Sequence, residues 1–295
     1  MKKIAIFIGT LVALSSTALM GSGFGSASAQ IETKMLKAPD GQQYEFIIVT
    51  ASASGSYHKA GLKLAKSLNS ATAATTDGSY QNMELLEKGA VSVAFVQADV
   101  YNYYISKHPN SATLFSIVET ERTEHVQLIM RKGGDENDLQ QKGAKVFIGL
   151  ENSGGAGSWR NIVALEDNYA AASVVTGPID SITFSDLEVG KIDAIVRTSH
   201  MTTGDDSVSS VVNNKKIDFV NFDDGDLNDE FEINGVSKPI YEFTEVEVEK
   251  GLFNDKEVVV LETKVFAVIS NKTTTRAQRA KIADKLKLYG NGLFL

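Results

Sequence analysis

Four apolar residues followed by small hydroxyl residues form the clearest pattern in the chain. Phe46 to Val49 predicts a buried strand, and residues 50–56 form a loop of Thr, Ala, Ser and Gly. From Tyr57 to Asn69 apolar residues recur at helical spacing, which predicts a helix. The first N–H groups of a helix have no partner inside it, so this loop offers free donors and hydroxyls to an anion. Alternatively, a serine of the loop simply caps the helix.

The same order returns about a hundred residues further along the chain. Residues 145–150 predict a strand, residues 151–158 a polar Gly-rich loop, and residues 159–168 a helix. Two such units suggest two similar lobes, each turning a helix N-terminus towards a shared cleft. Capping explains each loop separately, but it does not explain why both loops are long and rich in donors.

Other apolar runs alternate with helical patterns along the rest of the chain. Strands are predicted at 91–96, 114–118, 126–130, 192–197, 258–260 and 265–269. A final amphipathic helix carries Ile282, Leu286 and Tyr289 on one face. This alternation is typical of the α/β class, with a parallel sheet covered by helices on both faces. Gln97 and Asp99 follow a strand, at the carboxyl end where such sheets bind ligands.

The N-terminal residues have the order of a secretory signal peptide. Lys2 and Lys3 precede an apolar run from Ile4 to Leu14, and an A-x-A site ends at Ala29. We therefore expect a signal peptide at 1–29 and a periplasmic mature protein, with an uncleaved anchor as the alternative. The predicted division of the rest is 30–128 as the first part of lobe I, 129–215 as lobe II, and 216–295 as the return to lobe I with the C-terminal helix.

The composition excludes several classes of function. The net charge of −8 falls to −10 without the signal peptide, which holds two Lys and no acid. We find no basic patch, so nucleic acid is not an expected partner. The absence of cysteine excludes disulfides, thiolate metal sites and a cysteine nucleophile.

Common catalytic motifs are absent from the sequence, which predicts a binding protein without a cofactor. There is no G-x-S-x-G elbow, no H-E-x-x-H and no Walker loop. His58 and His200 flank candidate loops and could meet across the cleft, although hydrogen-bonded surface histidines are commoner. The acidic stretch at 223–226 could suggest calcium, but its spacing does not fit an EF-hand, so we expect a solvated loop and no metal.

Seven motifs resemble, in order, the TAXI-type solute receptors of TRAP transporters. They are Thr50–Tyr57, Gly78–Asn82, Val93–Val100, His125–Lys132, Ser153–Ala156, Gly190–Ala194 and Lys264–Ser270. The resemblance implies a two-lobed type II periplasmic binding protein, each lobe a mainly parallel sheet flanked by helices. It also implies a small organic acid or amino acid, including a glutamate-like one, held in the inter-lobe cleft and delivered to permease subunits. We expect a monomer that closes its lobes around this ligand.

The candidate ligand-binding residues are loop residues with hydroxyls or glycine, two aromatic residues, polar residues at strand ends and one cation. They are Ser52, Ser54, Gly55, Ser56, Tyr57, Gln97, Asp99, Ser153, Gly154, Gly155, Ser158, Trp159, Arg197 and Ser199. The candidate cations are Arg122, Arg131, Arg160 and Arg197. Arg197 is preferred because it follows a strand and its guanidinium can bind a carboxylate through two hydrogen bonds, with a surface ion pair as the alternative. Core packing is the competing role of the aromatic residues. The sequence is also compatible with phosphate or another oxyanion as the ligand, and with a membrane sensor as the partner.

Overall fold

A computed structural model describes residues 35–233, 236–249 and 256–294. The predicted signal peptide at 1–29 lies outside these residues. None of the helices in the described ranges combines the length and the apolar character that crossing a bilayer requires.

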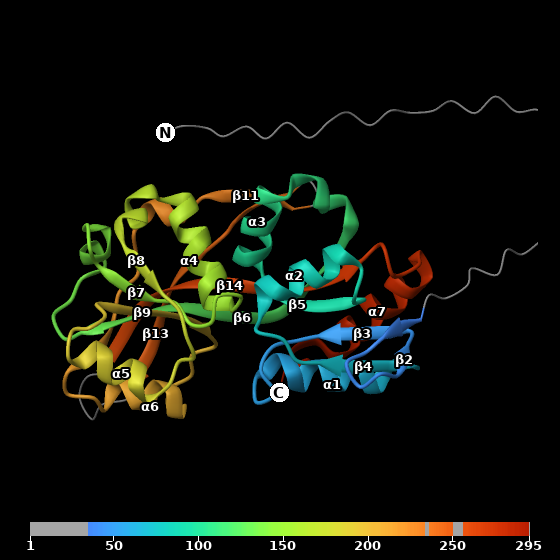
Figure 1. Cartoon of the computed structure of the whole chain (residues 1–295), viewed down its shortest axis with the longest axis horizontal. Coiled ribbons are helices and arrows are strands. Elements are labelled where there is room, and N and C mark those ends of the chain that lie inside the picture. Colours follow the sequence, from blue (N-terminus) through green and yellow to red (C-terminus); the bar gives the residue numbers. More distant parts are fainter. Residues whose placement is uncertain (1–34, 234–235, 250–255, 295) are drawn as a thin grey trace, which may run out of the picture. The chain divides into compact units, whose positions relative to one another are not determined.

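The centre of the molecule is a mixed sheet with two parallel groups of strands (Figure 1). Strands β4 (Ala71–Ala74), β3 (Phe46–Val49) and β5 (Val93–Gln97) pair in parallel, and so do β9 (Ala194–Ser199), β7 (Lys145–Phe147) and β8 (Ser173–Val175). Two long strands, β14 (Lys256–Ser270) and β6 (Phe115–Arg131), lie between the groups and pair with each other and with their neighbours in antiparallel fashion. We call the part around β4-β3-β5 the first half and the part around β9-β7-β8 the second half. The predicted α/β fold with two lobes is confirmed.

The first half contains the N-terminal elements and the last helix. Its elements are β1 (Leu36–Lys37), β2 (Gln43–Tyr44), β3 (Phe46–Val49), α1 (Ser56–Ser67), β4 (Ala71–Ala74), α2 (Ser79–Lys88), β5 (Val93–Gln97), α3 (Ala98–Lys107) and α7 (Arg276–Tyr289). The predicted face of α7 is buried through Ile282 and Leu286, which join the core beneath α1.

The second half contains the middle of the chain. Its elements are β7 (Lys145–Phe147), α4 (Gly154–Leu165), β8 (Ser173–Val175), α5 (Ser181–Glu188), β9 (Ala194–Ser199), α6 (Asp206–Val212), β10 (Ile217–Val220) and β13 (Glu242–Glu249). A separate ribbon is formed by β11 (Glu230–Ile233) and β12 (Val236–Pro239). The acidic stretch at 223–226, expected to be a solvated loop, lies between β10 and β11 and includes the start of a short 3-10 turn at Gly225–Leu227.

Two connections between the halves differ from the sequence prediction. The strands expected at 114–118 and 126–130 are one strand, β6 (Phe115–Arg131), and those expected at 258–260 and 265–269 are β14 (Lys256–Ser270). Both strands continue through charged residues because each is paired with the other along this stretch. After residue 216, β10 pairs with β6, and the chain then pairs with β5 of the first half along β14.

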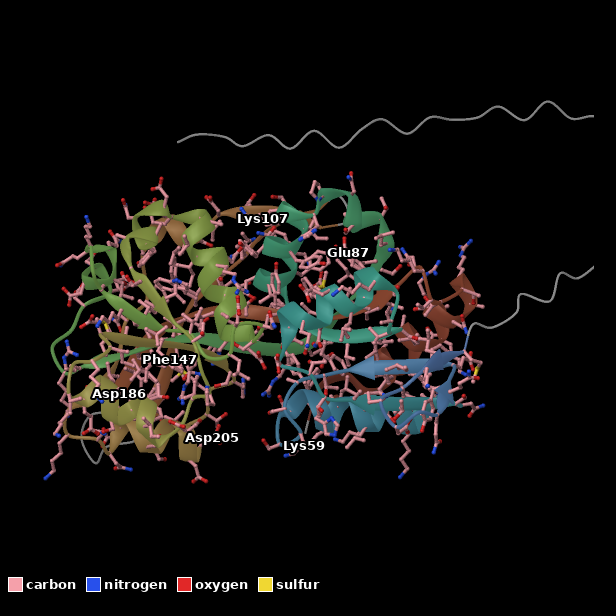
Figure 2. All side chains as sticks on the ribbon, viewed as in Figure 1. Lys59, Glu87, Lys107, Phe147, Asp186 and Asp205 are labelled. Atoms are coloured by element: carbon pink, nitrogen blue, oxygen red, sulfur yellow. The ribbon has the colours of Figure 1, made fainter. Side chains whose placement is uncertain are left out.

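Alternate side chains of the central strands fill cores on both faces of the sheet. In β3, Ile47 and Val49 enter one core while Phe46 and Ile48 enter another. In β9, Val196 enters one core of the second half and Ile195 enters the other. Figure 2 draws these side chains, with Phe147 labelled inside the second half. Helices therefore cover each half on both faces, and the polar residues at the strand ends are left where the halves meet.

Candidate functional site

The serines of the first predicted loop lie at the surface. Ser52 and Ser54 are exposed, and Ser56, the first residue of α1, is half-buried. Gly55 is the N-cap, and no described side chain caps this helix. The N–H of Gly55 donates instead to the carbonyl of Ser52 at 3.0 Å, which closes the turn.

Tyr57 leads from this loop into the interior. Its ring packs against Phe95 and Phe294, with centroids 5.9 and 6.0 Å away. Its hydroxyl donates to Oε2 of Glu124 at 3.2 Å, and Glu124 lies on β6. The predicted ligand residue Tyr57 is thus both a core residue and a donor to a buried carboxylate.

Gln97 reaches the same carboxylate from the end of β5. Its Nε2 donates to Oε2 of Glu124 at 2.9 Å. Its Oε1 is buried and has no hydrogen-bond partner among the described residues. A buried acceptor without a donor costs about 1–3 kcal/mol, so this amide is suited to receive a further N–H group.

Four helix N-termini come together around Gln97 and Glu124. Helix α1 contributes Tyr57, α3 follows Gln97 directly, and Oγ of Ser79 on α2 accepts from the N–H of Gln97 at 3.4 Å. Helix α4 of the second half begins at Gly154, where a methyl group would overlap the Gln97 side chain. Each N-terminus carries a partial positive charge, so together they favour an anionic group at this point.

Glu124 is the anionic group that occupies this position. Its residue is 7% exposed, and burial raises the pKa of its carboxyl to about 7. The positive charge of Arg122 and the donors Tyr57 and Gln97 oppose this rise, whereas the negative charge of Asp99 adds to it. The side chain is therefore poised to gain or lose a proton near neutral pH.

The positive charge of Arg122 acts on Glu124 and on two histidines, His125 and His200. The rings of His125 and His200 stack with centroids 5.4 Å apart, and Nε2 of His125 lies 3.4 Å from Oε2 of Glu262. Burial is the largest cause that lowers the pKa of both histidines, and neighbouring positive charge lowers it further. Within the described chain, neither Nε of Arg122 nor Nδ1 of His200 has a hydrogen-bond partner, although both atoms are buried.

Asp99 forms a second buried contact between the halves. Oδ2 of Asp99 accepts from the hydroxyl of Tyr241 at 2.9 Å, and Oδ1 accepts from the N–H of Val100. Asn161 of α4 also donates to the Tyr241 hydroxyl. Burial raises the pKa of Asp99, and the hydroxyls of Ser158 and Tyr241 oppose this rise. Asp99 therefore holds α3 against α4.

The second predicted loop is packed against neighbouring elements. Oγ of Ser153 accepts from the N–H of Ala156 at 3.2 Å, so Ser153 caps α4. A Cβ on Gly155 would lie 3.1 Å from the carbonyl oxygen of Ile148. Trp159 packs edge-on against Tyr169 in the core of the second half. Ser158 shares a hydrogen bond of 3.0 Å with Thr198.

Arg197 is engaged away from Glu124. Its Nε donates to Oε1 of Gln127 at 2.6 Å, and its Nη2 donates to the carbonyl of Ser207 at 3.1 Å. The guanidinium lies 5.8 Å from the ring centroid of Phe219, and burial lowers its pKa to about 10. Gln127 also donates to Ser199, so Arg197 and Ser199 belong to one internal network. The cation beside the buried carboxylate is Arg122.

The profile of one protein family matches residues 48–272, which is most of the chain. The chain belongs to the NMT1-like family. The match spans every predicted site residue as well as Arg122, Glu124 and Glu262. Among curated proteins, none matches this NMT1-like chain.

Solved structures with a similar fold are distant in sequence from this NMT1-like protein. The GluR0 ligand-binding core of Nostoc punctiforme, solved with L-glutamate, is 13% identical with a TM-score of 0.47, over 84% of this chain and 95% of its own. The amino acid ABC transporter substrate-binding protein AbpA of Streptococcus pneumoniae, bound to L-arginine, is 14% identical with a TM-score of 0.46. The similarity covers 84% of this chain and 90% of AbpA. The periplasmic VFT2 domain of BvgS from Bordetella pertussis is 13% identical with a TM-score of 0.44, over 84% and 89%.

Sequence reasoning missed the residues at the centre of the site. They are Glu124, His125, Tyr241 and Glu262, whereas Arg122 is one of the candidate cations but ranks below Arg197. The charges around Arg122 and Glu124 favour a connection between two strands when the sequence is considered alone. One signal could have found these residues: the stretch 115–131 contains no Gly, Pro, Asn or Asp, which favours one continuous strand over a turn.

His58 and His200, for which a meeting across the cleft is the less favoured alternative, lie in different places. Nδ1 of His58 lies 3.2 Å from Oγ1 of Thr50, whereas His200 stacks on His125. Within the described ranges, no three His, Cys, Asp or Glu side chains are arranged to hold a metal ion.

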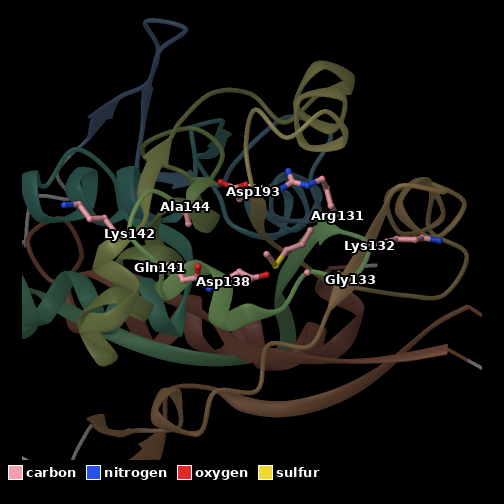
Figure 3. A pocket seen from close by; sticks show the side chains of 10 residues that line it. Arg131, Lys132, Gly133, Asp138, Gln141, Lys142, Ala144 and Asp193 are labelled. Carbon is pink, nitrogen blue, oxygen red and sulfur yellow. Dashed lines mark hydrogen bonds and ion pairs between the residues drawn. The ribbon is translucent and has the colours of Figure 1, made fainter.

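A surface hollow of about 430 Å³ lies apart from the predicted residues (Figure 3). It is lined by residues from the end of β6 and by residues before β7 and β9, including Arg131, Lys132, Lys142 and Asp193. Arg131 is held there by Asp193 at 3.0 Å and by the carbonyls of Leu187 and Ile192. None of the predicted site residues lines this hollow.

Proposed function

We propose that this NMT1-like protein is an exported, non-enzymatic solute receptor of the TAXI type. It captures a small organic acid or amino acid where its halves meet and delivers the ligand to the permease of a TRAP transporter. The ordered TAXI-like motifs support this assignment, and the family match, which ends at residue 272, covers all of them.

One observation carries the location of the site. Two buried polar atoms without partners in the described chain belong to Gln97, which donates to Glu124, and to Arg122, whose charge acts on Glu124. A third belongs to His200, on which the charge of Arg122 also acts. A ligand that offers complementary groups relieves the cost of these atoms, about 1–3 kcal/mol each.

The charges of the site favour an amino acid over an inorganic anion. Arg122 suits a carboxylate, which its guanidinium can bind through parallel hydrogen bonds. Glu124 and the unpaired Oε1 of Gln97 are both acceptors, which suits an ammonium group and opposes phosphate. We therefore assign the carboxylate of the ligand to Arg122 and its amino group to Glu124 and Gln97, with Tyr57 and His200 beside them.

A thermal-shift screen of the mature chain tests this function. The panel contains the twenty amino acids, small dicarboxylates, phosphate and sulfate. We expect one amino acid to raise the melting temperature, because a ligand at a hundred times its Kd stabilises by about 2.7 kcal/mol. A panel without any stabilising compound contradicts the receptor function, and a response to phosphate alone favours an oxyanion receptor.

Two arginine variants locate the binding. Arg122→Ala is expected to weaken calorimetric binding of the amino acid found by about 1.5–3 kcal/mol, since a charged hydrogen bond is lost. Arg131→Ala is the matched control, because Arg131 lies at the surface hollow and pairs with Asp193. Equal loss in both variants would contradict the assigned location.

A further inference from the structure

Glu124 is surrounded by groups that respond to its protonation. Two neutral donors, Tyr57 and Gln97, converge on one of its oxygens, at 3.2 and 2.9 Å. The titratable or charged groups that act on Glu124 are Tyr57, Asp99 and Arg122. Arg122 also acts on His125 and His200, which in turn interact with Glu262. Arg122 is the cation that acts on Glu124, and Nζ of Lys264 lies 3.6 Å from Oε1 of Glu262.

We propose that ligand capture is coupled to the release of a proton from Glu124, whose place the ammonium group of an amino acid takes. This inference rests on the proposed function. The step balances without a co-reactant: the carboxylic acid of Glu124 gives its proton to the buffer, and the carboxylate that results pairs with the ammonium group. No covalent bond other than the O–H bond of Glu124 changes.

The carboxylate of Glu124 and the free Oε1 of Gln97 favour an ammonium group in direct contact with them, although the helix N-termini around Glu124 favour negative charge. Oε1 of Gln97 lacks a donor within the described chain, and it belongs to the amide whose Nε2 already binds Glu124. An ammonium group has three N–H donors, so one group can serve both the amide oxygen and the carboxylate. A ligand carboxylate placed there would instead repel Glu124 and draw a proton onto it.

The direction of the pH effect follows from the burial of Glu124. Without the ammonium group its pKa is about 7, so the site holds about half a proton at neutral pH. An adjacent ammonium lowers this pKa, so binding releases that proton. Affinity should rise with pH and should fall about tenfold for each pH unit below 7. Protonation of His125 and His200 acts in the same direction at lower pH, because both would repel an ammonium group.

Titration calorimetry in two buffers measures the proton directly. L-glutamate is the first probe, followed by the other amino acids, and the buffers are phosphate and HEPES at about pH 7. We expect the binding heats to differ by the ionisation heat of about half a proton per ligand. Glutarate, which is glutamate without its amino group, should bind more weakly and take up a proton.

Two glutamate variants assign the proton to a residue. Glu124→Gln should bind with the same heat in both buffers and with an affinity that does not change between about pH 6 and 8. Glu136→Gln is the matched control, because Glu136 is also buried with a pKa raised to about 7, but it faces Asp223 in the second half. This variant should keep the buffer dependence of the wild type.

The outcomes separate this inference from the proposed function. Binding of an amino acid with equal heats in both buffers overturns proton release and leaves the receptor function in place. Proton release that persists in Glu124→Gln also overturns it. Failure of all twenty amino acids to bind overturns the receptor function and this inference together. The wild-type comparison between buffers stands even where Glu124→Gln does not fold.

Discussion

The loop before α1 lies at the surface, whereas the similar loop before α4 is packed between the two halves. Ser52 and Ser54 are exposed, and no described side chain caps α1. In the second loop Ser153 caps α4, and the residues from Gly155 to Trp159 are buried. Two stretches rich in small hydroxyl residues and glycine therefore have opposite surroundings.

The difference shows that a loop can be rich in small residues for two structural reasons. In the first loop they form a surface turn, and the residue that reaches the site is Tyr57. In the second loop they permit close approach, because a Cβ on Gly157 would lie 2.6 Å from a methyl carbon of Val100 on α3. The partner of such a glycine is distant in sequence, so the local pattern alone does not distinguish the two reasons.

Substitutions of the aromatic residue at the start of each helix should give the largest contrast between lost stability and altered ligand affinity. Trp159→Ala removes a side chain that is 2% exposed in the core of the second half, so we expect a loss of about 3–5 kcal/mol of stability. Tyr57→Phe keeps the ring and removes only the donor to Glu124, so it should alter ligand affinity more than stability. Chemical denaturation and calorimetry on both variants measure this. Unchanged stability in Trp159→Ala would assign Trp159 to the ligand instead.

Alanine substitutions of a glycine in each loop should give the second-largest contrast in stability. Gly157→Ala forces a methyl group against Val100, which is fully buried and stiff, and overpacking of this kind costs about 1–3 kcal/mol. Gly55→Ala is the control, because its φ of −78° suits alanine and its neighbours belong to an exposed turn. We expect it to cost less than about 1 kcal/mol. Equal melting temperatures in the two variants would remove the proposed distinction.

Arg197 tests whether the cation preferred from the sequence binds the ligand. A Cβ on Gly155 would lie 3.5 Å from the Cα of Arg197, yet the guanidinium pairs with Gln127 and Ser207. Arg197→Ala leaves the buried Oε1 of Gln127 without this donor, so we expect about 1–3 kcal/mol of lost stability and a nearly unchanged Kd. A much higher Kd with an unchanged melting temperature would restore Arg197 as the residue that binds the ligand.

The sequence predicts the local units of this fold well and its site only in part. The strand, loop and helix at Phe46–Ser67 and at Lys145–Leu165 follow from local hydrophobic periodicity. The bond from Tyr57 to Glu124 spans 67 residues and that from Tyr241 to Asp99 spans 142, so no local pattern contains them. Glu124 was missed because a charged residue in a strand resembles a connection until its pairing partner is known.

The smallest expected effects come from the serines of the two loops. Ser153→Ala removes the hydroxyl that accepts from the N–H of Ala156, and the loss of such a cap costs about 0.5–2 kcal/mol. Ser54→Ala changes an exposed side chain, so its stability should stay within about 0.5 kcal/mol of the wild type. Ser153→Thr is the control that keeps a hydroxyl at the cap, and it should recover most of the lost stability.

Because Ser153 lies next to Gly154, which contacts Gln97, calorimetry must accompany the melting curves. A fall in affinity without a fall in melting temperature, in either alanine variant, would mean that the hydroxyl binds the ligand and not the helix.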